Sequence, residues 1–94
     1  MIVSMSTDEI RTQKGLALLE FKEAEENLHA LERRKDLMAN AFRKFAGCLE
    51  SEAREECRQN AQLTAQSALD LLDKIAEART KFVAAEEKKS QFGL

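Results

Sequence analysis

Residues 16–49 read LALLEFKEAEENLHALERRKDLMANAFRKFAGCL, a stretch in which apolar side chains recur every three or four positions. In heptads counted from Ile10, ten of twelve seam positions are apolar, and only Lys14 and Lys35 interrupt the series. A repeat of this length is typical of a helix that packs in a coiled coil. The apolar seam residues are Ile10, Ala17, Phe21, Ala24, Leu28, Leu31, Met38, Phe42, Phe45 and Leu49.

The composition of the whole chain also indicates helices. Ala, Leu, Glu, Lys and Arg make up 54 of the 94 residues, a share typical of coiled coils and long helices. The chain has no Pro and three Gly, which excludes a Gly-rich phosphate-binding loop and a Pro-rich linker. Val, Ile and Thr are too few to build a sheet. We therefore expect an all-α fold in one domain that spans residues 1–94.

Capping signals predict where the first helix begins and ends. Ser6, with Glu9 three residues later, has the spacing of an N-terminal capping box. Gly47 can adopt the left-handed conformation that often ends a helix. These signals predict a first helix over residues 6–46, followed by a turn over residues 47–51.

A second helix is predicted over residues 52–90. Ser51, with acidic residues after it, suits the start of a helix, and Gly93 follows the expected end. A short connection between two helices of similar length favours an antiparallel hairpin of the coiled-coil type.

Folding the chain at the predicted turn indicates which side chains meet between the helices. Phe21 falls near Ile75 and Ala78, and Glu20 falls beside Arg79. Polar pairs of this kind can fix the alignment of a coiled coil.

Each predicted helix carries more apolar surface than one neighbouring helix covers. Dimerisation into a four-helix bundle buries this surface most simply, so we expect a homodimer, with a different protein partner as the alternative. Leu16 and Leu19, which lie off the seam, are candidates for binding such a partner. The residues expected at the interface are Phe21, Leu28, Leu31, Phe42, Leu72, Ile75 and Phe82.

The sequence contains no convincing pattern for catalysis or for metal binding. Glu26 and His29 have the Glu-x-x-His spacing of di-iron bundles, but helical geometry points both side chains away from the seam. With a single His on that outer face, Ser and Cys nucleophiles lack a general base. We therefore expect no enzyme activity, no catalytic residue, no cofactor and no metal.

Two cysteines, Cys48 and Cys57, lie near the predicted turn. Two thiols and one His are too few for a disulfide framework or a structural zinc site. We expect reduced thiols. A single disulfide is the alternative, because antiparallel packing can bring the two residues within bridging distance.

Positive charge is concentrated in Arg33, Arg34, Lys35, Arg43 and Lys44. Acidic neighbours dilute this cluster, the formal net charge is −2, and no aromatic residues are interleaved for base stacking. We therefore expect no nucleic-acid partner, and a weak RNA- or DNA-binding hairpin dimer is a second alternative function.

Phe45, Ala46 and Gly47 lie at the predicted turn, and Glu86 follows Phe82 by four residues. In these features, and in its length and two-helix layout, the chain resembles the WXG100 (ESAT-6-like) secreted hairpin proteins. That family carries Trp-x-Gly at the turn and a Tyr-x-x-x-acidic export signal near the C-terminus, and Phe stands at both aromatic positions here. The resemblance implies a secreted helical hairpin as an alternative function, either WXG100-like or another helical hairpin of a specialised secretion system.

The apolar helix surface and the lack of catalytic motifs predict a protein-protein interaction module, such as a small adaptor, chaperone or inhibitor. The longest apolar runs are four residues, so we expect no transmembrane helix. Residues 1–5 lack the features of a signal peptide. We expect a cytoplasmic protein, or one exported without a cleavable signal peptide.

Overall fold

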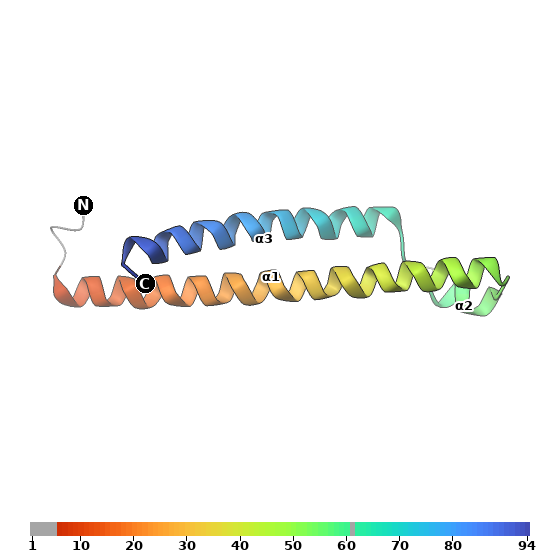
Figure 1. The fold of residues 1–94 in the computed structure, drawn as a ribbon, viewed down its shortest axis with the longest axis horizontal. Coiled ribbons are helices and arrows are strands. Elements are labelled where there is room, and N and C mark those ends of the chain that lie inside the picture. The colour runs from red at the N-terminus through yellow and green to blue at the C-terminus, as the bar shows by residue number, and fades with distance from the viewer. Residues whose placement is uncertain (1–5, 61) are drawn as a thin grey trace. The chain divides into compact units, whose positions relative to one another are not determined.

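Three helices form the chain in the computed structural model, which describes residues 6–60 and 62–94. They are α1 (Thr7–Glu50), α2 (Arg54–Gln59) and α3 (Ala65–Gln91) (Figure 1). All regular secondary structure in the described residues is helical, which confirms the all-α class. The signal-peptide prediction for residues 1–5 lies outside the described residues.

The chain divides into two compact units, each described by itself. Unit 1 joins the part of α1 that ends at Leu28 with residues Glu77–Leu94, and unit 2 comprises His29–Ala76. In both units a segment of α1 packs against a segment of α3 that runs in the opposite direction (Figure 1). The antiparallel pairing of two long helices is therefore confirmed.

The buried side chains of α1 belong to the predicted apolar seam. In unit 1 the least exposed are Ala17, Leu28, Ala78 and Ala85, and in unit 2 they are Leu31, Leu71 and Ile75. Three of these seven residues are alanines, so large side chains make up only part of the core. Burying a Leu or Ile side chain contributes roughly 1.5–3 kcal/mol, which makes Leu28, Leu31, Leu71 and Ile75 the main sources of hydrophobic stability.

The beginning of α1 agrees with the prediction. The backbone N–H of Glu9 donates a hydrogen bond to Ser6 Oγ over 3.2 Å, and the N–H of Ile10 donates to the Ser6 carbonyl over 3.0 Å. Ser6 is therefore the N-cap of α1. Asp8 and Glu9 place negative charge in the first turn, where the helix dipole favours it.

The predicted end of the first helix at residue 46 is wrong, because α1 continues through Gly47 to Glu50. The left-handed conformation falls on Glu52, whose φ is 58°. The N–H of Glu52 donates to the Leu49 carbonyl over 3.2 Å, and the N–H of Ala53 donates to the Cys48 carbonyl over 2.8 Å. These two bonds form a Schellman motif that ends α1.

The predicted continuous second helix over 52–90 is also wrong, because α2 ends at Gln59 and α3 begins only at Ala65. Ala53, rather than Ser51, is the N-cap of α2, and it makes no side-chain capping bond. No side chain of α2 is buried, so little packing holds this short helix. Ala61, which falls within the predicted second helix, lies outside the described residues.

Thr64 and Ser67 cap the beginning of α3. The N–H of Ser67 donates to Thr64 Oγ1 over 3.0 Å, and the N–H of Thr64 donates to Ser67 Oγ over 3.2 Å. Each side-chain oxygen thus accepts a hydrogen bond from the backbone N–H of the other residue, as in a capping box with Ser as the third helical residue. This cap explains why the helix restarts at Ala65.

Candidate functional site

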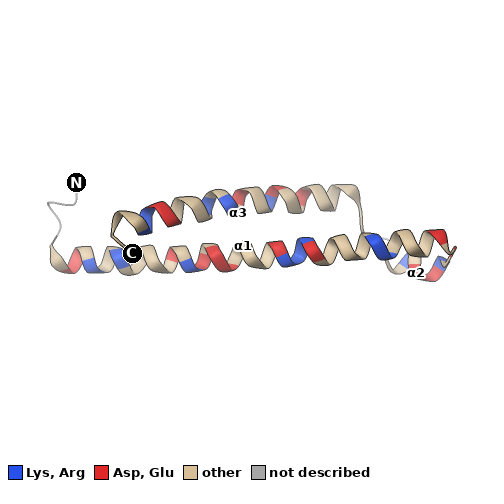
Figure 2. Cartoon of the chain, in the orientation of Figure 1, with Lys and Arg blue, Asp and Glu red and all other residues tan. Residues whose placement is uncertain are grey.

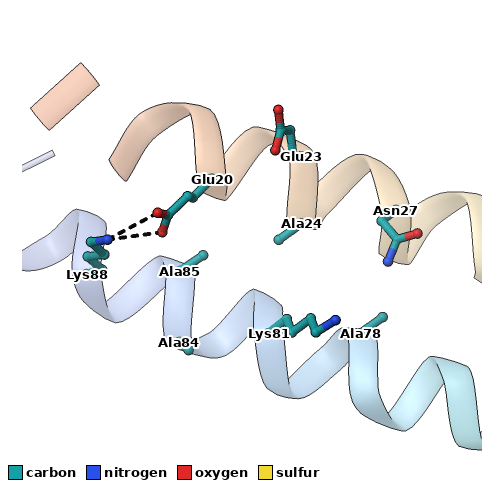
Figure 3. A pocket seen from close by; sticks show the side chains of 9 residues that line it. All are labelled: Glu20, Glu23, Ala24, Asn27, Ala78, Lys81, Ala84, Ala85 and Lys88. Atoms are coloured by element: carbon teal, nitrogen blue, oxygen red, sulfur yellow. Dashed lines mark hydrogen bonds and ion pairs between the residues drawn. The ribbon is translucent and has the colours of Figure 1, made fainter. Parts of the chain in front are cut away.

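A groove in unit 1 lies between α1 and α3 and has a volume of about 450 Å³ (Figure 3). Its floor is made of small side chains, and charged side chains stand on its rim. Figure 3 shows Glu20 and Lys88 joined across one end, where Lys88 Nζ lies 3.2 Å from both carboxylate oxygens. Both side chains are about half exposed, so this ion pair contributes at most about 1 kcal/mol. The lining residues are Glu20, Glu23, Ala24, Asn27, Ala78, Lys81, Ala84, Ala85 and Lys88.

An aromatic pair also joins the two helices in unit 1. The rings of Phe21 and Phe82 have centroids 5.3 Å apart and are inclined by 35°. Lys89 Nζ lies 4.0 Å from the centroid of the Phe21 ring, within the range of a cation–π interaction.

These contacts correct the predicted pairing across the hairpin. Phe21 pairs with the ring of Phe82, about one turn of α3 beyond the predicted Ala78 and two turns beyond the predicted Ile75. The ionic partner of Glu20 is Lys88 rather than Arg79. The prediction assumed one tight turn after residue 46. In the structure α1 ends at Glu50, the short helix α2 follows, and α3 begins only at Ala65, so the connection between the two long helices uses more residues than predicted.

A second groove, in unit 2, is almost entirely apolar and has a volume of about 210 Å³. Lys35, the seam lysine of this segment, lines it and is half-buried, so its aliphatic chain covers apolar surface. Ligand and helix-binding sites are commonly concave and mostly apolar, as this groove is. We call it the unit 2 groove, and its lining residues are Lys35, Met38, Ala39, Phe42, Ala68, Leu71 and Leu72.

Large hydrophobic side chains are exposed in both units. Among the described residues nine are between 43% and 68% exposed, whereas only four large aliphatic side chains are buried. Exposed large apolar side chains that gather into a patch mark interaction sites. The exposed residues indicate self-association or a partner, and they are Leu16, Leu18, Leu19, Leu37, Leu49, Leu69, Leu72, Val83 and Leu94.

The predicted interface residues fall into two groups. Leu28, Leu31 and Ile75 are buried inside the chain's own helix pairs, so they are not available to another molecule. Phe21, Phe42 and Phe82 are half-buried, whereas Leu72 is 51% exposed. Leu16 and Leu19, the candidates for partner binding, are 46% and 53% exposed.

The groups considered for chemistry lie apart from both grooves. His29 and Glu26 are exposed on α1, and no group of three or more His, Cys, Asp or Glu suited to a metal occurs among the described residues. Cys48 and Cys57 are free, half-buried thiols. Partial burial, followed by electrostatic interaction with Cys48 and Glu56, raises the pKa of the Cys57 thiol, which works against nucleophilic activation.

The basic residues of α1 do not form one face. Arg33, Arg34 and Lys35 are consecutive, so their side chains point about 100° apart around the helix. Figure 2 shows acidic residues interspersed with the basic ones along α1. Arg43 Nη1 donates a 2.7 Å hydrogen bond to Asn40 Oδ1. This arrangement does not favour a phosphate-binding surface.

The structure has no turn at residues 45–47, where the resemblance to the WXG100 proteins requires one. Phe45, Ala46 and Gly47 lie inside α1, and the chain reverses only after Glu50. Phe82 contacts Phe21, so its ring serves the packing of unit 1. No described helix has a segment long and apolar enough to pass through a membrane.

No protein-family model, no curated protein and no solved structure matches the chain.

Two features of these surfaces were missed at the sequence level. The contact of Lys89 with Phe21 had a signal, because Lys89 follows Phe82 by seven residues and therefore shares its face of α3. No sequence signal pointed to the unit 2 groove, because its residues come from both helices and their juxtaposition depends on a register that the sequence did not predict.

Proposed function

We propose that the protein is a non-catalytic interaction module, a small adaptor, chaperone or inhibitor that works by self-association through apolar helix surface. The observation that carries this proposal is the excess of exposed over buried large hydrophobic side chains in the described residues. Burial of such side chains drives most protein association, so their exposure favours binding to another copy or to a partner.

The location of the apolar surface supports the same proposal. The unit 2 groove is bordered by Leu72, which is half exposed, and has Phe42 and Met38 on its opposite side. Aromatic residues and Met are enriched at interfaces, and an amphipathic helix fits a groove of this kind. Two hairpins that cover each other's apolar faces form a four-helix bundle.

Sedimentation equilibrium of the purified chain over a wide concentration range tests the proposal. We expect a dimer, because each copy offers apolar surface to the other. A chain that stays at the 10.6 kDa monomer mass at every concentration would overturn the proposed self-association.

A variant with a polar surface sharpens this test. Changing six of the exposed leucines to Gln removes apolar surface without touching the core, and we expect a helical monomer. A control changes three exposed basic and three exposed acidic residues to Gln, which leaves the net charge at −2, and should still associate. The six leucines are Leu16, Leu18, Leu19, Leu37, Leu69 and Leu72, and the six control positions are Lys22, Arg33, Lys74, Glu23, Glu26 and Glu87.

A further inference from the structure

A second apolar stripe runs along α3 in unit 2, beside the stripe that packs on α1. Its residues are separated by four, three and four positions, so they fall within about 60° of one another around the helix. All four are exposed, and the two leucines are 55% and 51% exposed. This spacing is that of a coiled-coil seam. The stripe consists of Ala65, Leu69, Leu72 and Ala76.

The stripe is symmetrical about its own midpoint, between residues 70 and 71. Reversing its direction exchanges Leu69 with Leu72 and Ala65 with Ala76, so the order of large and small side chains stays the same. An interface between two identical chains around a two-fold axis requires such a self-complementary surface. An antiparallel copy of α3 therefore fits this stripe, with leucine opposite leucine and alanine opposite alanine.

A stripe with the same spacing lies on α1 of unit 2, and it carries charge. Glu32 and Asp36 precede its midpoint, and Ala39 and Arg43 follow it. Helical geometry places the four within about 60°, on the side of α1 where Ala39 lines the unit 2 groove.

The order of these charges favours an antiparallel copy of α1. Antiparallel pairing about the midpoint, between residues 37 and 38, places Glu32 of each copy opposite Arg43 of the other. Parallel pairing of the same stripe would place Glu32 opposite Glu32 and Arg43 opposite Arg43. Complementary charge of this kind selects one orientation and suppresses the other.

One axis serves both stripes. Met38 lies next to the midpoint on α1 and Leu71 next to the midpoint on α3, and both side chains line the unit 2 groove. The two midpoints therefore lie at the same level of unit 2. A single two-fold axis through that level can pair α1 with α1 and α3 with α3 at once.

We propose that this face of unit 2 binds the same face of a second copy of the chain, with each helix antiparallel to its counterpart. The inference rests on the proposed self-association and names its surface, its orientation and its register. Leu69 and Leu72 of the two copies form the centre of the interface, and two Glu32–Arg43 pairs flank it.

A charge exchange tests the orientation and the register. Glu32→Arg places two arginines together at both ends of the interface, and Arg43→Glu does the same with two glutamates. Each single variant is expected to weaken the dimer by on the order of tenfold. The double variant E32R/R43E restores opposite charges and is expected to return the dissociation constant to near that of the parent chain. Sedimentation equilibrium measures all three, and far-UV circular dichroism checks that each stays helical.

Engineered cysteines give a second measurement of the same pairing. In a chain with Cys48→Ser and Cys57→Ser, differently tagged Ala65→Cys and Ala76→Cys chains are mixed and treated with a short bifunctional thiol cross-linker. Antiparallel pairing predicts cross-links between the two tags when the variants are mixed, and few cross-links when either variant is alone. A parallel interface gives the reverse pattern and would overturn the proposal.

A pair of leucine variants separates this proposal from the broader function. Leu72→Glu is expected to abolish the dimer. Leu37→Glu is the control and is expected to leave the dimer intact. Leu37 is also an exposed residue of unit 2, but it points about 100° away from Asp36 around α1 and so lies off the proposed interface. A dimer that survives Leu72→Glu would overturn this interface and leave self-association standing. A parent chain that is already monomeric would overturn both.

Discussion

Glu52 occupies the same position in the turn after α1 that Gly93 occupies in the turn after α3. Both residues have a positive φ, 58° for Glu52 and 74° for Gly93. In both turns the residue donates its N–H to the carbonyl three positions back, to Leu49 and to Ser90 respectively. The next N–H closes the motif in each case, from Ala53 to Cys48 and from Leu94 to Lys89. The same motif therefore ends both long helices. Its left-handed position holds Gly, the favoured residue, after α3 and Glu after α1.

Replacing Glu52 with Gly is expected to stabilise the protein. A side chain in the left-handed region costs roughly 1–2 kcal/mol, and Gly avoids this cost at the expense of a more flexible unfolded chain. We expect a net increase of about 1 kcal/mol in the free energy of unfolding, measured by urea denaturation. Glu50→Gly, two residues earlier and inside α1, is the matched control and should lower the stability by about 1 kcal/mol. An E52G chain less stable than the parent would contradict the assigned conformation.

The comparison of Gly47 with Glu52 shows why the end of α1 could not be predicted from sequence. Gly47 was the residue best suited to a helix end, but its cost inside a helix is only about 1 kcal/mol. The structure keeps α1 helical through Gly47, and the helix ends three residues later, at Glu50. The preference of Gly47 for a helix end was therefore too weak to end α1 at that residue.

The apolar series was a stronger predictor than the turn signals. Ala17, Leu28 and Leu31 are all buried, as their seam positions indicated, because burial on one face depends on the helical period alone. The partner of each residue depends instead on how many residues the connection uses. An error in that connection moved the partner of Phe21 from Ile75 to Phe82, about two helical turns along α3.

Thr64→Ala is expected to destabilise the beginning of α3. The substitution removes the acceptor for the Ser67 N–H, and loss of such a cap costs about 1 kcal/mol. Thr12→Ala is the control, because Thr12 Oγ1 only donates to the Asp8 carbonyl within α1 and Ala is the better helix former. The control is expected to change the free energy of unfolding by less than about 0.5 kcal/mol. Equal losses in the two variants would argue against the capping role of Thr64.

Phe21 and Phe82 are expected to stabilise unit 1 as a coupled pair. Changing each to Leu keeps an apolar side chain and removes one ring, so a double-mutant cycle isolates the interaction between the rings. We expect a coupling energy of about 0.5–1.5 kcal/mol in favour of the pair, measured by thermal or urea unfolding. The control cycle combines Phe82→Leu with Phe42→Leu, a residue of the unit 2 groove, and should be additive within about 0.5 kcal/mol. Additivity in both cycles would refute a direct contact of the rings.

Cys57 is expected to react slowly with alkylating reagents at neutral pH. Its raised pKa, caused first by partial burial and then by Cys48 and Glu56, reduces the fraction present as thiolate, which is the reactive form. The rate of alkylation by iodoacetamide, followed by mass spectrometry against pH, should reach its midpoint at a higher pH than for a cysteine in an unfolded peptide.

Cys48→Ser is expected to lower the pKa of Cys57, because it removes one of the electrostatic interactions that raise it. Since the folded chain disfavours the Cys57 thiolate, this thiol contributes stability below its unfolded pKa, and the contribution is lost as pH rises through the folded value. Glu56→Gln removes the electrostatic interaction with Glu56 and should shift the midpoint in the same direction. If neither substitution moved the midpoint, burial alone would account for the raised pKa, and the two thiols would not interact across the turn between α1 and α2.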